Sequence, residues 1–510
     1  MKHHRIKLIT FALFVMFTAA SFASALQAEK AKGKAARNIP RTWDEAGFAG
    51  MDLPLADPTR TPTHVSADYY YKIPVMQIYK SYPIYAPDKE PPGYMDWLKQ
   101  QEPEIAFDAS KLETEEDWIK AGELVFEAPI TYNALNKLAD VRNPEWYKKS
   151  GMPLSKDGIM PFNRYVVSEK GVVDVGEFSC ATCHTRVMPD GTVIKGAQGN
   201  YPLGRLDELF ARSKANPNDE KRFFERARFA WRLAYVTPWL KPDPMEEMLK
   251  MSVDEVASVS GGRPPGVQSR TGTSLIYPVA ISDLIGVKDR RYLDRTGLQL
   301  HRSIGDMMRY AALNQGASFF DRYGDFLPYG ELPDPNIRSR YSDEQLYALT
   351  LYLYSLKPPP NPNKFDALAA RGQKIFQREG CAGCHTPPLY TNNKLTPVEG
   401  FKVPEQHLKQ FDILPYSVET DPNLALKTRR GTGYYKVPSL KGVWYRGPFE
   451  HSGSVATLED WFDPRRTRDD YVPTGFRGVG VKTRALKGHR FGLDLSDEDR
   501  KALIAFLKTL

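Results

Sequence analysis

Cysteine is scarce in this chain, with only four copies among 510 residues. They fall into two matching segments, Cys180-Ala-Thr-Cys183-His184 and Cys381-Ala-Gly-Cys384-His385. Because these segments use every cysteine, the sequence leaves no thiol for a disulfide bond or for a zinc site built on cysteine.

The chain also lacks a long apolar segment beyond its N-terminus, and it lacks a basic tract interleaved with aromatic residues. The first absence argues against a membrane span, which needs about 20 apolar residues. The second argues against nucleic-acid binding despite a net charge of +8. Methionine is missing after Met308, which limits the metal ligands that the C-terminal part of the chain offers.

Each cysteine pair fits the C-x-x-C-H pattern of c-type haem attachment. In this pattern two thiols add to the two vinyl groups of one haem, and the histidine ligates the iron. A single copy could arise by chance or belong to a redox dithiol, but two copies that use all the cysteines indicate two covalently bound haem c groups. The predicted haem-binding residues are Cys180, Cys183, His184, Cys381, Cys384 and His385.

The N-terminus has the three parts of a secretory signal peptide. Lys2, Arg5 and Lys7 form a basic start, Leu8 to Ala20 form an apolar run, and Ala23-Ser24-Ala25 is a small-residue cleavage site. No cysteine lies at this site, which argues against a lipoprotein. We expect residues 1–25 to be removed, leaving a periplasmic or secreted protein with no integral membrane span.

An internal repeat organises the rest of the chain. Segments that start at Ser342 and Ser496 both place a capping serine before acidic residues, followed by apolar residues at helical spacing. Upstream, Gly122-Glu-Leu-Val-Phe126 parallels Gly372-Gln-Lys-Ile-Phe376. This order resembles the class I cytochrome c fold, in which the first and last helices cross beside the haem.

The predicted fold is mainly α, with two class I cytochrome c-like haem domains in tandem. The first spans 115–356 and carries a large insertion, and the second spans 364–510. A proline-rich linker at 357–363 separates them, because consecutive prolines cannot continue a helix. Residues 26–114 are rich in Pro, Tyr and Asp and show little periodicity. We expect them to form an irregular N-terminal extension packed on the haem domains, with a disordered start as the alternative.

The second ligand of each iron decides what a haem does. The second domain contains no methionine, so we expect a histidine there. His489 lies just before the terminal helix, about where a cytochrome c supplies its distal ligand, and it is our predicted sixth ligand. His451 is the rival, and His407 is expected at the surface.

For the first haem, His301, Met307 and Met308 lie on one predicted helix before the terminal helix. Both methionines also suit a role in the core. The insertion leaves room for a pocket, so we expect an open or weakly blocked iron, with His301 as an alternative ligand. Glu246 and Glu247 are candidate acid–base groups, against the alternative of a solvated helix face.

Three segments of the second domain carry a family resemblance. They are residues 436–444 (KVPSLKGVW), 447–454 (GPFEHSGS) and 456–460 (ATLED). These segments resemble the bacterial di-haem cytochrome c peroxidase and MauG superfamily. The resemblance implies an oxidoreductase in which the second haem relays electrons to the first, where peroxide or dioxygen reacts. It also implies a small redox protein or another electron donor or acceptor as a partner.

The chain departs from that family in three places. The position of the family's Met or Tyr ligand, fourteen residues after His451, is Arg465. The family's calcium site has a threonine where this chain has Arg446, so calcium is only a secondary expectation. The first domain is larger than usual in that family.

A long first domain and a C-terminal histidine ligand resemble the rubber oxygenases, which cleave polyisoprene with oxygen. The other hypotheses are an electron carrier with two six-coordinate irons and a sensor of small ligands.

Overall fold

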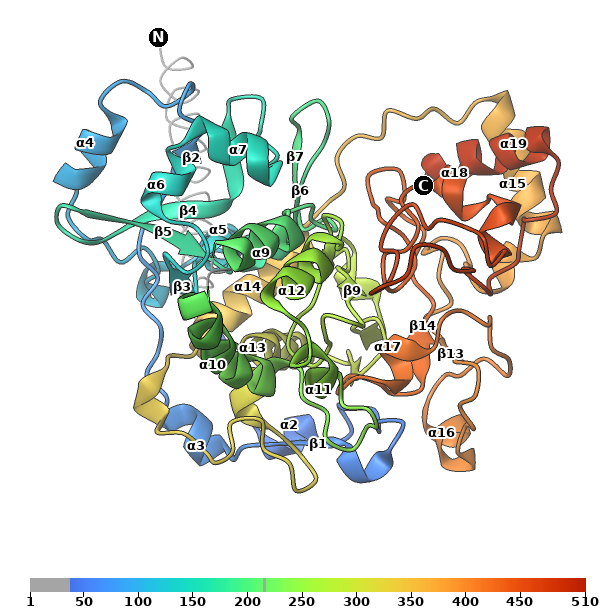
Figure 1. Cartoon of the computed structure of the whole chain (residues 1–510), viewed down its shortest axis with the longest axis horizontal. Coiled ribbons are helices and arrows are strands. Elements are labelled where there is room, and N and C mark those ends of the chain that lie inside the picture. Colours follow the sequence, from blue (N-terminus) through green and yellow to red (C-terminus); the bar gives the residue numbers. More distant parts are fainter. Residues whose placement is uncertain (1–36, 214–216) are drawn as a thin grey trace, which may run out of the picture.

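The computed structural model describes residues 37–213 and 217–510, so the expected signal peptide at 1–25 lies outside the described residues. Helices are the main elements of the described residues, and a four-stranded sheet and several two-stranded ones accompany them. Residues 364–510 lie together on the right of Figure 1, and an extended segment across the top joins them to the first half. The described residues include no helix that is long and apolar enough to cross a membrane.

One helix pair forms the centre of the first half. Helix α5 (Glu115–Glu127) packs against α14 (Asp343–Ser355). A Cβ placed on Gly122 would overlap the carbonyl oxygen of Ala348, so glycine allows the two backbones to approach closely. Phe126 and Tyr352 pack beside this crossing, with ring centroids 5.3 Å apart.

The second half repeats this crossing. Helix α15 (Ala367–Arg378) packs against α19 (Asp497–Lys508), and a Cβ on Gly372 would overlap the carbonyl oxygen of Ala502. Phe376 and Phe506 again lie 5.3 Å apart. The predicted serine caps are present at both terminal helices, because Ser342 accepts from the Gln345 amide and Ser496 from the Asp499 amide.

The glycine at each crossing provides a test of this packing. We expect Gly372→Ala to lower the free energy of unfolding of the protein by about 1–3 kcal/mol, because the added methyl group forces the helices apart. Thermal or denaturant unfolding measures the change. Gly262→Ala is the matched control, since its Cβ would meet only ordinary contacts of 3.4 Å or more. Equal stability of the two variants would contradict the close crossing.

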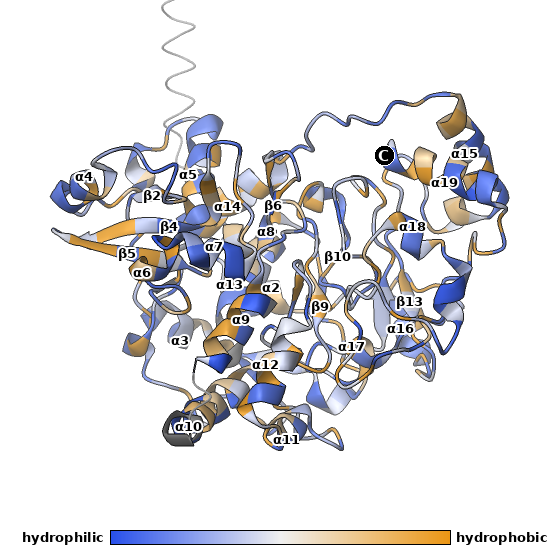
Figure 2. Ribbon diagram, turned by 45° about the horizontal axis from the view of Figure 1, so that its top comes forward, coloured by the Kyte–Doolittle hydropathy of each residue, from blue (hydrophilic) through white to orange (hydrophobic). Residues whose placement is uncertain are grey.

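The large insertion of the first half is a sheet, which the prediction of a mainly α chain did not foresee. Strands β2 (Ser81–Tyr85), β4 (Ile159–Glu169), β5 (Val172–Glu177) and β3 (Thr131–Tyr132) lie in the order β2-β4-β5-β3, all antiparallel. The buried side chains of Phe162, Tyr165 and Val175 give this sheet its own core. Strands β4 and β5 are accordingly among the hydrophobic segments on the left of Figure 2.

Further helices enlarge the first half around this frame. The remaining strands form short antiparallel pairs. The helices are α6 (Leu138–Val141), α7 (Pro144–Ser150), α9 (Leu203–Arg212), α10 (Pro217–Ala234), α11 (Pro244–Met248), α12 (Val253–Gly261) and α13 (Ile304–Phe320). The strand pairs of the first half are β1 (Pro62–His64) with β12 (Asp321–Tyr323), β6 (Thr185–Val187) with β7 (Val193–Lys195), β8 (Val267–Gln268) with β9 (Val279–Ala280), and β10 (Tyr292–Leu293) with β11 (Gln299–Leu300). In the second half, β13 (Leu395–Pro397) pairs with β14 (Tyr434–Lys436).

The described part of the N-terminal extension, 37–114, is built into the first half. It contains the short helices α2 (Glu45–Phe48), α3 (Ala67–Lys72) and α4 (Tyr94–Gln100) and supplies β2 to the sheet. Trp43 stacks on Tyr70 at 4.2 Å, and both side chains are buried in the same core as α14. This segment therefore contributes to the stability of the first half.

A buried charge cluster also fastens the extension. His64 lies between two carboxylates, with Nε2 2.7 Å from Asp52 and Nδ1 2.9 Å from Asp321. Burial lowers the pKa of His64, but the hydrogen bonds and charges of Asp321 and Asp52 outweigh it and raise the pKa to about 10. The protonated form is therefore favoured in the folded protein.

This raised pKa predicts a pH dependence of stability. The stabilisation is complete below the unfolded pKa of about 6.5 and is lost as pH rises through about 10, because the folded protein then loses the extra proton. We expect the thermal midpoint of the wild type to fall across this interval by more than that of His64→Gln. Parallel pH curves for the two proteins would contradict the assignment.

Candidate haem sites

The first C-x-x-C-H segment forms the one-turn helix α8 (Cys180–His184), capped by Ser179. The Thr182 hydroxyl donates to the carbonyl of Phe162 at 2.9 Å, so the inserted sheet supports this turn. His184 places Nδ1 3.0 Å from the carbonyl oxygen of Ser282. Burial lowers the pKa of His184 to about 4, so the ring is neutral and its Nε2 lone pair remains for a metal.

The second segment starts with the 3₁₀ turn η5 (Cys381–Gly383). His385 places Nδ1 3.1 Å from the carbonyl oxygen of Pro438, which matches the contact of His184 with Ser282. Burial also lowers the pKa of His385 to about 4. None of the four cysteines forms a disulfide bond, so all four are available for thioether attachment.

A cavity of about 220 Å³ lies beside the second segment. Cys381, Cys384 and His385 line it on one side, and His489 also lines it. Most other lining side chains are apolar or aromatic, among them Phe376, Leu414, Val418, Val443, Phe449, Leu458, Trp461, Phe462, Phe491, Leu503 and Leu507. This combination of thiols, two histidines and apolar walls fits a haem bound through its vinyl groups and iron.

His489 faces His385 across the space that an iron would occupy. Their ring centroids are 6.3 Å apart. A metal–imidazole bond of about 2 Å, with each nitrogen about 1.1 Å from its ring centre, places two opposite ligands about 6 Å apart. His489 Nδ1 is buried without a hydrogen-bond partner, and burial lowers the pKa of this ring to about 3. The two rings thus match the geometry of a bis-histidine iron site.

The backbone of His489 is held in an unusual conformation. Its φ of +43° is in the left-handed region, which is uncommon for residues other than glycine. Its N–H donates to the carbonyl of Val418 at 2.6 Å. The buried guanidinium of Arg466 donates to the carbonyl oxygens of Leu486, Gly488 and His489 at 2.6, 3.1 and 2.8 Å. Arg466 therefore positions His489, a role that the sequence analysis missed.

The other predicted residues of the second half lie elsewhere. The His451 ring stacks on Tyr435 at 3.8 Å, and its Nε2 contacts the Asp421 carbonyl and the Glu450 carboxylate. This ring lines the cavity but is engaged by these partners. Arg465 is exposed and pairs with Asp463 at 2.7 Å. The prediction that His407 lies at the surface is wrong, since it is buried and bonds the Tyr434 hydroxyl at 2.9 Å.

The candidate ligands of the first haem have different surroundings. His301 uses both ring nitrogens, one with the Arg290 carbonyl at 2.9 Å and one with the Tyr354 hydroxyl at 2.6 Å, which argues against it as an iron ligand. Met307 and Met308 are buried in a core that includes residues of α14 and also Ala181, and Cys180 packs against the same core. In the described part of the chain, His385 and His489 are the only two histidine rings in mutual contact.

The two acid–base candidates, Glu246 and Glu247, lie on a solvated helix. Glu246 on α11 is exposed, and the Glu247 carboxylate pairs with Lys250 at 2.7 Å. Both glutamates therefore belong to a solvated helix face, which argues against the predicted acid–base role. The polar group found beside the first segment is Gln268, whose Oε1 lies 3.3 Å from Cys183 Sγ and whose Nε2 is buried without a partner.

A second internal repeat supports the two proximal histidines. Residues 281–297 (ISDLIGVKDRRYLDRTG) and 437–453 (VPSLKGVWYRGPFEHSG) share Leu, Gly, Val, Arg and Gly at the same positions. The second residue of each segment, Ser282 or Pro438, supplies the carbonyl that faces the proximal histidine. The shared arginines, Arg290 and Arg446, each donate to the carbonyl of the third residue in their own segment.

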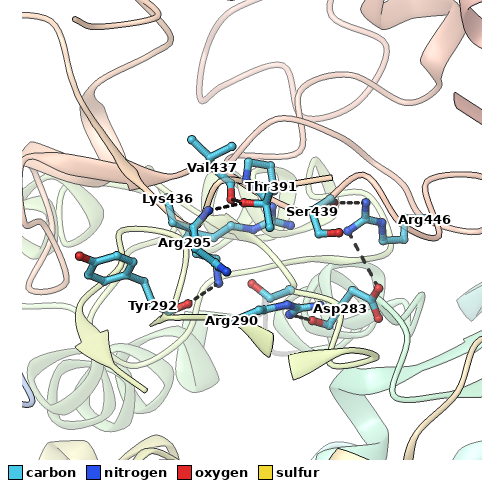
Figure 3. Close-up of a pocket in the computed structure, with 12 residues that line it drawn as sticks. Asp283, Arg290, Tyr292, Arg295, Thr391, Lys436, Val437, Ser439 and Arg446 are labelled. Carbon is cyan, nitrogen blue, oxygen red and sulfur yellow. Dashed lines mark hydrogen bonds and ion pairs between the residues drawn. The ribbon is translucent and has the colours of Figure 1, made fainter. Parts of the chain in front are cut away.

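These two segments meet at Asp283 and Arg446, a pair that we call the junction. Arg446 donates to the Ser439 carbonyl at 2.6 Å and lies 4.0 Å from the Asp283 carboxylate (Figure 3). Asp283 also accepts from the Tyr445 hydroxyl at 3.1 Å. Because Asp283 follows Ser282 and Ser439 follows Pro438, the junction connects the two residues whose carbonyls face the proximal histidines.

Comparisons with known proteins give partial matches. No family model matches the chain. The methylamine utilization protein MauG of Methylorubrum extorquens is 29% identical over 143 residues, which cover 28% of this chain and 34% of MauG. The cytochrome-c peroxidase IdrP1 of Denitromonas iodatirespirans is 29% identical over 168 residues, covering 28% of this chain and 40% of that protein. The match therefore spans less than half the length of either relative.

Two solved structures show only distant likeness. Hydrazine synthase of Kuenenia stuttgartiensis aligns over 49% of this chain and 78% of its own, with 17% identity and a TM-score of 0.30. A MauG-like protein associated with microbial copper homeostasis aligns over 33% of this chain and 56% of its own, with 21% identity and a TM-score of 0.22. These scores are too low to establish a common fold. On the two sequence relatives, the chain is related to the di-haem cytochrome c peroxidase and MauG superfamily.

Proposed function

We propose that this protein is an exported di-haem c oxidoreductase, with two class I cytochrome c-like domains at 115–356 and 364–510. Electrons enter at the site of Cys381, Cys384 and His385 and pass to the site of Cys180, Cys183 and His184, where peroxide is reduced. The two haems would supply one-electron redox chemistry and, at the first site, a place for the oxidant to bind. The reaction H₂O₂ + 2 e⁻ + 2 H⁺ → 2 H₂O then takes its electrons from a small redox protein.

The observation that carries this proposal is the difference between the two sites. His489 faces His385 at 6.3 Å, which supports a saturated, electron-carrying iron. His301 is engaged on both nitrogens, and no other described histidine ring contacts His184, which supports an open first iron. One saturated and one open site suit a relay that ends in oxidant binding.

The junction supports transfer between the sites. Its path runs from His184 through Ser282 and Asp283 to Arg446, and then through Ser439 and Pro438 to His385. Only three hydrogen bonds and one ion pair interrupt the covalent path. The carbonyls of Ser282 and Pro438 orient the two imidazoles, and the junction between Asp283 and Arg446 connects the segments that carry these carbonyls.

Carbon monoxide and turnover together test the proposal. We expect the reduced wild type to bind CO at one of its two haems, and the protein to oxidise a reduced cytochrome c when peroxide is added. The Cys180→Ala/Cys183→Ala variant is the control and should lose both signals while keeping the His385 site. A reduced spectrum that CO leaves unchanged would reject the open site and favour a pure electron carrier.

A rubber-oxygenase-like dioxygenase is the second candidate. It is favoured by the enlarged first half and by a C-terminal histidine, His489, opposite His385. Incubation with polyisoprene and dioxygen, followed by detection of carbonyl-ended fragments, separates this activity from peroxide reduction.

A further inference from the structure

Four basic side chains surround a small cavity where the two halves meet. Arg290 and Arg295 come from the first half, and Lys436 and Arg446 come from the second (Figure 3). The cavity has a volume of about 30 Å³, and Asp283 is the only acidic residue among those that line it. We call these four residues the cationic cluster.

The hydrogen bonds of this cluster go to neutral oxygens. Arg295 donates to the carbonyls of Ala280 and Ile281 at 2.9 Å each, and Lys436 Nζ donates to the Tyr292 carbonyl at 3.3 Å. Arg446 bonds the Ser439 carbonyl, its Nε is buried without a partner, and its distance to Asp283 is a long 4.0 Å. Asp283 is thus the one carboxylate that lines the cavity, while Asp294 attracts Arg295 and Lys436, and Glu450 attracts Arg295, from outside it.

Burial and mutual repulsion disfavour the charged forms of Lys436 and Arg295 more than the neighbouring carboxylates favour them. Burial, followed by repulsion from Arg290 and Arg295, lowers the pKa of Lys436 far below its usual value. Burial, followed by repulsion from Arg446 and Arg290, lowers the pKa of Arg295 to about 10. Charges taken out of water in this way are stable only when opposite charges join them. An anionic ligand at the cluster would supply that charge.

The position of the cluster identifies the ligand class. Arg295, Lys436 and Arg446 also line the larger cavity that holds Cys381, His385 and His489. A haem is apolar over its ring and carries two carboxylates at one edge, so its propionates need a basic part of an otherwise apolar wall. The three shared cations supply such a part.

We propose that the cationic cluster is the carboxylate site for the propionates of the haem held by Cys381, Cys384 and His385. This inference rests on haem attachment at that site, which is part of the proposed function, but it does not depend on any reaction with peroxide or dioxygen. Because Arg290 and Asp283 belong to the segment that supports His184, the same site couples the charge of this haem to the first half.

The midpoint potential of the low-spin haem tests the site. Lys436→Met should lower this potential, because losing a positive charge beside the carboxylates favours the ferric form. Lys436→Arg keeps the positive charge and should leave the midpoint potential close to the wild-type value. Lys441→Met is the matched control, since Lys441 is exposed on the same segment, and it should leave the potential unchanged. The pyridine haemochrome assay should show two haems per chain in every variant compared.

Three outcomes would overturn the proposal. The first is an unchanged potential in Lys436→Met. The second is an equal shift in Lys441→Met. The third is a wild-type potential that depends on added acetate or phosphate at constant ionic strength, which would assign the cluster to a soluble anion. If Lys436→Met fails to incorporate haem, Arg295→Gln is measured in its place, with the same expected fall and the same contradiction if the potential is unchanged.

Discussion

Replacing His489 with alanine should convert the haem at Cys381 and Cys384 from a low-spin to a high-spin site. The reason is geometric, because the His489 ring faces His385 at 6.3 Å and has a buried, unpaired Nδ1. Without this ring the iron keeps His385 alone, and an open position remains. Ferric absorption spectra and CO titration of the reduced protein measure the change, with CO binding rising from about one to about two molecules per chain.

The rival histidine provides the matched control. His451 lines the same cavity, but its ring is engaged by Tyr435, Glu450 and the Asp421 carbonyl. His451→Ala should therefore keep the low-spin spectrum. If His489→Ala keeps that spectrum and His451→Ala loses it, the ligand assignment is wrong.

The Arg466→Gln variant should lose both stability and the low-spin site. Arg466 is 2% exposed and donates to the carbonyls of Leu486, Gly488 and His489, which fix the loop that carries the ligand. Each buried carbonyl left without a donor costs about 1–3 kcal/mol, so we expect the free energy of unfolding to fall by about 3 kcal/mol. The released loop should also give a mixture of low-spin and high-spin ferric haem.

Arg465, the neighbour of Arg466 in the sequence, is a control with the same charge. Arg465 has a side chain that is 77% exposed and pairs only with Asp463, a type of contact worth less than about 1 kcal/mol. Arg465→Gln should leave both the unfolding curve and the spectrum nearly unchanged. Equal effects of the two substitutions would mean that Arg466 does not position His489.

The features that the sequence predicted depend on local chemistry. The C-x-x-C-H spacing is fixed by one haem, and the serine caps at Ser342 and Ser496 are fixed by the free amides of a helix N-terminus. The paired segments at Gly122 and Gly372 anticipated the two helix crossings, because only glycine permits the approach. The absence of methionine from the second domain predicts a histidine ligand there, and His489 lies opposite His385 in the structure.

The features that were missed depend on contacts between distant segments. His301 and Glu247 looked like site residues, but their partners Tyr354 and Lys250 hold them elsewhere. The sheet of β4 and β5 was assigned to an undefined insertion, although its core is contributed by residues far apart in the chain. The repeat at 281–297 and 437–453 was visible in the sequence, but its meaning appears only when both segments support a proximal histidine.

The central claim is that the two haem sites differ, with a saturated iron at His385 and an open iron at His184. Electron paramagnetic resonance of the ferric wild-type protein tests it most directly, because high-spin and low-spin irons give separate signals that can be integrated. The account predicts one high-spin haem and one low-spin bis-histidine haem in equal amounts. Two low-spin haems, with no high-spin signal, would contradict it.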